Sequence, residues 1–299
     1  MILATANDPS VKRGERRAAS SGRRSLSTAF AMVCVLMAGG CQSPGRTPFT
    51  YAELRAASPD MRMDFDDPGD RGRFVTGLMT ASMSSTDGTF DLLALSGGGA
   101  DGAYGAGVLT GWSDRGDRPQ FEVVTGVSTG ALMAPFAFIG PDGDAELSRA
   151  FIDGRTSGVL EPRWVMAAFG PGLYRQGPLR ARVASVITPE IIDAIAAQHR
   201  LGRRLFVATT SLDTQRQVIW DLGSLAAEGG SNRRQKFIDI LVASASIPVI
   251  FPPVLIELER DGARVRELHA DGRTTANFFV APERLMLDQE LLGSSAVPG

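Results

Sequence analysis

Apolar runs and amphipathic segments alternate along the chain from about residue 90. Residues 91–96 (DLLALS) form a continuous apolar run that ends at glycines, and 103–112 have the spacing of a helix. A second apolar run at 121–125 is followed by a second helical segment at 131–138. Strand, helix, strand, helix in this order predicts a parallel sheet that helices cover on both faces.

Later segments add to the same domain. Thr188, Pro189 and Glu190 predict the start of a helix that runs to His199. The apolar run 205–210 predicts a strand that pairs with 217–221, and Asp261-Gly262 between two alternating segments predicts a hairpin. We therefore expect one α/β domain, a three-layer sandwich with a mostly parallel central sheet, helices on both faces and a late antiparallel edge.

The first 40 residues have the pattern of an export signal. A basic leader precedes the apolar run 29–40, and this run of twelve residues ends at Cys41. The run is too short to cross a hydrocarbon core, which needs about 20 residues, but it suits the apolar region of a secretory signal. The small residues before Cys41 resemble a bacterial lipoprotein signal, although Ala38 stands where Leu is usual. A plain secretory signal, an uncleaved anchor, or a twin-arginine signal at Arg23-Arg24 are the alternatives.

This resemblance implies a signal peptide at 1–40 and a lipid-carrying Cys41. It places the protein in a bacterial cell envelope, anchored to a membrane at the outer membrane or the periplasmic face, and Gln42 is compatible with outer-membrane sorting. Residues 41–86 are rich in Ser, Pro, Arg and Asp, which predicts a tether with a short helix near Tyr51–Ala57. The catalytic domain is then expected at 87–299.

Composition limits the chemistry that this domain can perform. The chain has 299 residues, 31 basic and 33 acidic, with a net charge of −2, so no basic footprint for nucleic acid is present. Two cysteines and two histidines are too few for a disulfide framework or a Cys/His zinc site. We therefore expect no metal, no cofactor and no nucleic-acid partner, and chemistry based on hydroxyl and carboxylate groups.

A glycine-rich loop follows the first predicted strand. Gly97, Gly98 and Gly99 lie between a strand and a helix, where converging backbone N–H groups can bind an anion. Together with Gly102 they also satisfy the dinucleotide-binding pattern G-x-G-x-x-G. That pattern requires an acidic residue at the far end of the next strand, whereas Glu122 opens it. A tight structural turn is the third interpretation of this loop.

A second motif ends the next strand. Gly126-Val127-Ser128-Thr129-Gly130 reads G-x-S-x-G, and at a strand-to-helix turn this pattern indicates a nucleophile elbow. The glycines Gly126 and Gly130 permit the sharp turn that exposes the Ser128 hydroxyl. The alternative is a serine that only caps the following helix.

A serine nucleophile needs a base, and the sequence offers two. The serine–acid–histidine order of α/β-hydrolases would use Asp213 and His269. His269 lies on the last strand and His199 on a charged amphipathic helix, so both are interpreted as structural or solvated. Asp271, which ends a predicted strand before Gly272, is then the candidate base.

These motifs together closely resemble the patatin-like phospholipases. The resemblance rests on the ordered segments LLALSGGGADGAYGAGVL, GVSTGAL, SASIPVIFPP and LHADGRTTANFF, and it covers about Phe90 to Pro282, including YRQGPLR and ATTSLDTQRQVIWDLG. It implies a patatin-like sandwich and a Ser-Asp dyad without histidine. In that dyad Ser128 is the nucleophile and Asp271 the base. The backbone of Gly97, Gly98 and Gly99 supplies the oxyanion hole.

Three features depart from the family pattern. Asp101 stands where a basic residue is usual, Arg273 replaces the second small residue of D-G-G/A, and only 28 residues follow Asp271. Arg273 is expected to crowd the site or to meet a lipid phosphate.

The resemblance implies a serine acyl hydrolase that cleaves fatty acyl esters of phospholipids or related lipids. A small-ester esterase and a non-catalytic lipid-binding lipoprotein are the alternatives. An apolar stripe on a helix is usually core, and Met133, Phe136 and Phe138 after the elbow are interpreted in this way. The alternative is that they line an acyl channel.

Overall fold

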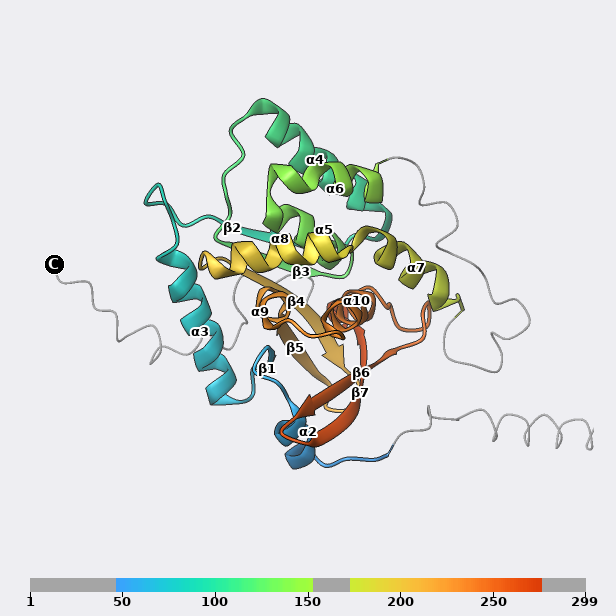
Figure 1. Cartoon of the computed structure of the whole chain (residues 1–299). Coiled ribbons are helices and arrows are strands. Elements are labelled where there is room, and N and C mark those ends of the chain that lie inside the picture. The colour runs from blue at the N-terminus through green and yellow to red at the C-terminus, as the bar shows by residue number, and fades with distance from the viewer. Residues whose placement is uncertain (1–46, 153–172, 276–299) are drawn as a thin grey trace, which may run out of the picture. The chain divides into compact units, whose positions relative to one another are not determined.

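The computed structural model describes residues 47–152 and 173–275, all within one unit that contains Thr47–Gly299 (Figure 1). The predicted signal peptide 1–40 and Cys41 lie outside the described residues. The strands are β1 (Arg62–Asp64), β2 (Leu92–Leu95), β3 (Val123–Val127), β4 (Arg204–Ser211), β5 (Arg216–Asp221), β6 (Val254–Arg260) and β7 (Ala263–Asp271). The helices are α2 (Tyr51–Ala57), α3 (Pro68–Ser82), α4 (Gly102–Arg115), α5 (Thr129–Ile139), α6 (Asp144–Phe151), α7 (Gln176–Val186), α8 (Pro189–Arg200), α9 (Leu222–Glu228) and α10 (Arg233–Ser244), with short 3-10 turns at Gly99–Asp101, Pro141–Gly143 and Gly272–Thr274.

The predicted start of the helix at Thr188 and the predicted hairpin at Asp261-Gly262 are both confirmed. Thr188 caps α8 by accepting from the N–H of Ile191, and Pro189 occupies its first turn. The β6–β7 hairpin turns at Asp261 and Gly262, whose φ angles are 51° and 84°. Both residue types tolerate a left-handed backbone, which this kind of turn requires.

The sheet is mixed, so the prediction of a mostly parallel sheet is wrong. Its main path runs β1-β5-β4-β3-β2, and β7 pairs with both β4 and β6. Among the described residues only β2–β3 and β3–β4 pair in parallel, and the other four pairings are antiparallel. Parallel pairs need a crossover helix. The short β4–β5 and β6–β7 connections contain none, and the N-terminal β1 adds an antiparallel edge at β5.

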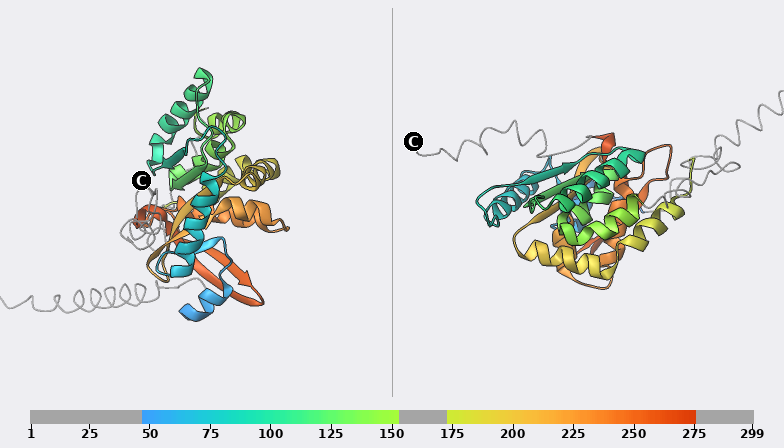
Figure 2. Two further views of the ribbon diagram at one scale, coloured as in Figure 1. Left: turned by 90° about the vertical axis from the view of Figure 1, so that its left-hand side faces the viewer. Right: turned by 90° about the horizontal axis from the view of Figure 1, so that it is seen from above.

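Helices cover both faces of this sheet, as expected of a three-layer sandwich (Figure 2). α3 packs on one face, where its Phe74 contacts the ring of Phe206 from β4 with centroids 4.7 Å apart. The larger apolar cluster lies on the other face and includes side chains of α5, α8, α9 and α10. Almost all of α5 is buried, which gives the elbow at its N-terminus a fixed support.

The segment 47–86 is folded, so the prediction of a tether over 41–86 is wrong for these residues. The expected helix Tyr51–Ala57 is present as α2, with a capping box between Thr50 and Glu53. It is followed by β1 and α3. β1 pairs with β5, and its Arg62 forms a fully buried ion pair with Glu267 of β7 at 2.7 Å.

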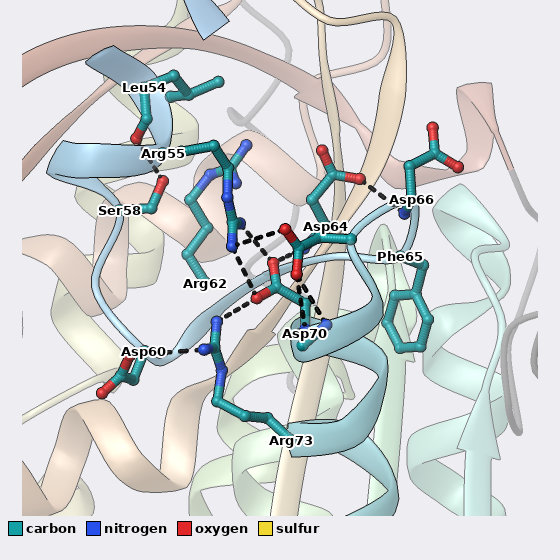
Figure 3. Close-up of polar contacts among 12 residues, drawn as sticks. Leu54, Arg55, Ser58, Asp60, Arg62, Asp64, Phe65, Asp66, Asp70 and Arg73 are labelled. Atoms are coloured by element: carbon teal, nitrogen blue, oxygen red, sulfur yellow. Dashed lines mark hydrogen bonds and ion pairs between the residues drawn. The ribbon is translucent and has the colours of Figure 1, made fainter. Parts of the chain in front are cut away.

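A second ion cluster fixes α2 to the start of α3 (Figure 3). The buried carboxylate of Asp70 accepts from both terminal nitrogens of Arg55, at 2.6 and 3.1 Å, and contacts Arg73. It also accepts from the backbone N–H of Asp64 at 2.7 Å. The charged residues of this segment suggested a solvated linker, but in the structure Asp70 is paired with Arg55 and Arg73.

Candidate active site

Ser128 occupies a strained turn between β3 and α5. Its backbone angles are φ 56° and ψ −125°, a region that non-glycine residues enter at a cost of about 1–3 kcal/mol. Gly126 and Gly130 make the turn possible, because a Cβ at Gly126 would lie 2.7 Å from the carbonyl oxygen of Gly130, and one at Gly130 would overlap the carbonyl of Leu95. The predicted elbow geometry is therefore present.

The order of the strands brings Asp271 to this turn. β5 occupies one edge of β4, so β3 and β7 must share the other edge. β3 ends with Val127 opposite Ala208, and β7 ends with Asp271 opposite the next residue, Thr209. The two strands meet end to end, and Ser128 Oγ donates to Asp271 Oδ2 at 2.6 Å.

The carboxylate of Asp271 is buried, and each of its two oxygens accepts a hydrogen bond. Burial raises its pKa above the ordinary value, and the bond from Ser128, the N–H of Arg273 at 2.8 Å and the charge of Arg273 offset part of this rise. A carboxylate with a raised pKa is a stronger base than a solvated one. Asp271 is therefore suited to accept the Ser128 proton.

The glycine loop lies against the serine. A Cβ at Gly97 would lie 2.7 Å from Cβ of Ser128, and Gly99 has a φ of 57°. The Thr129 hydroxyl bonds the carbonyl of Gly99 at 3.3 Å, which ties the loop to the elbow. The loop leads into α4, so its backbone lies at a helix N-terminus beside the hydroxyl.

A cavity of about 490 Å³ opens beside Ser128. This volume lies in the range of small-molecule sites, about 300–1,000 Å³. Its described walls come from the glycine loop, α4, α5, α6, α7, α10 and the loop after α10, and they are apolar apart from Ser128, Thr129 and Arg182. The lining residues are Gly99, Ala103, Ser128, Thr129, Leu132, Ala150, Phe151, Leu179, Arg182, Val183, Val186, Ile187, Leu241, Ala245, Ile247, Ile250 and Phe251.

Comparison with known proteins gives the family. The model of the patatin-like phospholipases matches residues 93–282, which is more than half of the chain and includes Ser128 and Asp271. The chain belongs to the patatin-like phospholipase family. No curated protein matches the chain. Among solved structures, VipD from Legionella pneumophila is similar over 65% of this chain and 47% of its own length, so the chain spans about half of VipD, with 13% identity and a TM-score of 0.34.

Two departures from the patatin-like pattern lie at the glycine loop. A Cβ at Gly97 would overlap Cδ of Arg273 and lie 3.1 Å from its Cγ, so the Arg273 side chain covers this glycine. The expected crowding by Arg273 is therefore present. Asp101 belongs to the turn that follows, and a Cβ at Gly98 would lie 3.3 Å from its Cβ.

The apolar residues that follow the elbow belong to the core. Met133, Phe136 and Phe138 are buried in the core and do not line the cavity. The interpretation of these three residues as core is therefore confirmed. Leu132 and Thr129, on another side of the same helix, face the cavity instead.

The histidine-based alternative is not assembled in this patatin-like domain. His269 is fully buried, with Nδ1 2.9 Å from the Thr209 hydroxyl and Nε2 3.0 Å from Glu267. Asp213 accepts from the N–H of Leu268. Burial, then the charges of Arg204 and Arg200, lowers the pKa of His199 to about 4, and this ring packs against Gly223 on α9.

The dinucleotide-binding alternative also finds no support. Glu122 is buried at the start of β3, and its carboxylate accepts from the N–H of Asp91 at 2.7 Å.

The described residues contain no group of three or more side chains suited to hold a metal ion. No helix in the described ranges is long and apolar enough to cross a membrane.

Two serines that contact the dyad could not be assigned a role from the sequence. Ser244 and Ser246 lie in the segment SASIPVIFPP at the end of α10. The hydroxyl of Ser244 accepts from the N–H of Ser128, and the carbonyl of Ser246 accepts from the N–H of Asp271. The segment SASIPVIFPP could be recognised from its resemblance to the family, but only the folded chain shows which of its atoms contact Ser128 and Asp271.

Proposed function

We propose that this chain is a serine acyl hydrolase with a Ser-Asp dyad that cleaves fatty acyl esters of phospholipids or related lipids. The observation that carries the proposal is the 2.6 Å bond from Ser128 Oγ to Asp271 Oδ2 beside an apolar cavity. Membership of the patatin-like phospholipases supports lipid acyl hydrolysis in general.

In the first half of the reaction, Ser128 Oγ attacks the ester carbonyl carbon while its proton passes to Asp271 Oδ2. The carbonyl oxygen becomes an oxyanion, and the N–H groups of Gly97, Gly98 and Gly99 donate to it. Each such donor contributes about 2.7–4 kcal/mol to transition-state stabilisation. Because the N–H of Ser128 already donates to Ser244, the glycine loop is the source of these donors.

In the second half, the oxyanion collapses and the bond between the acyl carbon and the alcohol oxygen breaks. Asp271 returns its proton to the leaving alcohol, and the acyl group remains on Ser128. A water molecule then attacks this acyl-enzyme, with Asp271 accepting the water proton and passing it back to Ser128 Oγ. Fatty acid and alcohol are released, and the dyad is restored.

The apolar cavity supports a long acyl chain as the group that Ser128 receives. A fluorophosphonate probe and a panel of phospholipids, neutral lipids and short esters test the proposal. We expect covalent labelling that Ser128→Ala abolishes, and faster hydrolysis of long-chain than of short-chain lipid esters. Labelling with turnover of short esters alone would support the small-ester esterase, and lipid binding without labelling would support a non-catalytic lipoprotein.

We also propose that Cys41 carries a lipid anchor, which would hold the enzyme in a bacterial cell envelope at the outer membrane or the periplasmic face. The support is the sequence alone, the apolar run 29–40 followed directly by Cys41. Cys41→Ser should give an unprocessed or soluble protein where the wild type partitions with membranes. Unchanged mass and unchanged partitioning of the variant would refute the anchor.

A further inference from the structure

The strained elbow needs an external support. Ser128 holds a φ of 56°, and such a conformation persists only where the surrounding structure fixes it. Its carbonyl accepts from the N–H of Ala131 at 2.9 Å, which begins α5. Its own N–H also needs a hydrogen-bond partner, because the residue is buried.

The hydroxyl of Ser244 supplies that partner. It accepts from the N–H of Ser128 at 3.0 Å and donates to the carbonyl of Ala208 in β4 at 2.7 Å. Ser244 is fully buried and is the last residue of α10. One hydroxyl therefore links the elbow to the strand beside it. The Ala208 carbonyl also lies against Gly272, where a Cβ would come within 2.5 Å of its oxygen.

The same end of α10 holds the base. The carbonyl of Ser246 accepts from the N–H of Asp271 at 2.9 Å. The Ser246 hydroxyl itself donates to the carbonyl of Val242 at 2.7 Å, within its own helix end, and receives a bond from the Gln176 amide at 3.1 Å. The two backbone N–H groups of the dyad are thus fixed by residues two positions apart.

We propose that Ser244 is a positioning residue that sets the distance and direction of Ser128 Oγ toward Asp271. Its hydroxyl acts only through the backbone of Ser128 and does not reach the substrate. The hydroxyl of Ser246, by contrast, has no bond to the dyad, since Ser246 acts through its carbonyl. This assignment rests on the proposed hydrolase function for its kinetic consequence and on the structure alone for its hydrogen bonds.

The test compares Ser244→Ala with Ser58→Ala, which is the same change at another buried serine, whose hydroxyl donates to the carbonyl of Leu54 at the end of α2. In Ser244→Ala the N–H of Ser128 loses its acceptor, so kcat for a soluble short-chain ester and the rate of fluorophosphonate labelling should fall by about 10- to 100-fold. KM should change little, because the cavity is intact. Ser58→Ala should keep the wild-type kcat.

A second pair of variants holds size constant. Ser244→Thr keeps a hydroxyl and Ser244→Val replaces it with a methyl group, so a higher kcat for Thr than for Val assigns the effect to the hydrogen bond. This pair decides the matter if Ser244→Ala fails to fold. Equal kcat values for Thr and Val, or equal losses in Ser244→Ala and Ser58→Ala, would overturn the proposal.

Hydrogen exchange of the Ser128 amide separates this inference from the proposed function. The amide should exchange slowly in the wild type and in Ser58→Ala, and faster in Ser244→Ala. If the wild type labels no probe and cleaves no ester, the proposed function fails while slow exchange still supports the bond. Unchanged exchange in Ser244→Ala would overturn the positioning role whatever the activity.

Discussion

Replacing Asp271 by Asn tests the dyad most directly. The change keeps the shape of a side chain that is 1% exposed and removes the negative charge that would accept the Ser128 proton. The amide can still bond the hydroxyl of Ser128 and the N–H of Arg273, so the turn at Gly272 should keep its structure. A loss of activity would then report the missing base and not a collapsed site.

The magnitude follows from the geometry. Ser128 Oγ contacts Asp271 at 2.6 Å, and both histidines have other contacts, so the residues that the structure describes offer the hydroxyl no histidine base. General acid–base catalysis contributes about 10²–10⁴ in rate, which corresponds to about 2.7–5.4 kcal/mol of barrier. We expect kcat to fall by that factor.

We expect Asp271→Asn to lower activity without lowering the stability of the fold. Burial raises the pKa of Asp271, so the folded state holds the ionised carboxylate less readily than the unfolded chain does. At neutral pH this ionisation opposes folding, and its cost disappears when the group is neutral. Asp271→Asn should therefore have a Tm no lower than that of the wild type while it is almost inactive.

The assay is ester hydrolysis by purified variants, with thermal melts of each. Ser128→Ala should be as inactive as Asp271→Asn, and the double variant little worse than either, because residues that act as one unit are not additive. His199→Ala and His269→Ala should keep most activity per folded molecule. A folded His269→Ala as inactive as Ser128→Ala, together with an active Asp271→Asn, would refute the dyad in favour of a histidine base.

Three further predictions concern the surroundings of the dyad. Arg273→Ala removes a charge that lowers the pKa of Asp271, so the acid limb of the kcat profile should move to higher pH, and an unmoved limb would contradict this. Arg62→Met leaves Glu267 buried without its arginine, which should lower the free energy of unfolding by about 3–5 kcal/mol in urea titrations, and Arg62→Met with Glu267→Leu should recover part of the loss. Val183→Phe narrows the cavity, so hydrolysis of long-chain esters should fall more than that of an acetyl ester, and equal losses would show that the acyl chain lies elsewhere.

The sequence alone determined the local geometry of the site. Gly126 and Gly130 flank Ser128 at a strand-to-helix turn, and their lack of Cβ atoms is a property of the residues themselves, so the elbow could be predicted. Caps and tight turns such as Thr188 before α8 and Asp261-Gly262 between β6 and β7 depend on neighbours within a few residues. Such signals are readable because the interacting atoms are close along the chain.

Only the tertiary structure decided which distant residues meet. Ser128 and Asp271 are 143 positions apart, and they touch because β3 and β7 share one edge of β4, which no pattern in either segment specifies. The support of Ser128 by Ser244 likewise depends on where α10 ends against the sheet.

The same reason explains the wrong predictions. Residues 47–86 resembled a tether because single charged residues favour water, but Arg62 and Asp70 find partners that neutralise them in the fold. Strand direction in the sheet and the side of α5 that faces the cavity also depend on how the elements pack. The spacing of hydrophobic residues along the chain predicts that a side chain is buried. Only the folded chain determines whether that side chain lies in the core or lines the cavity beside Ser128.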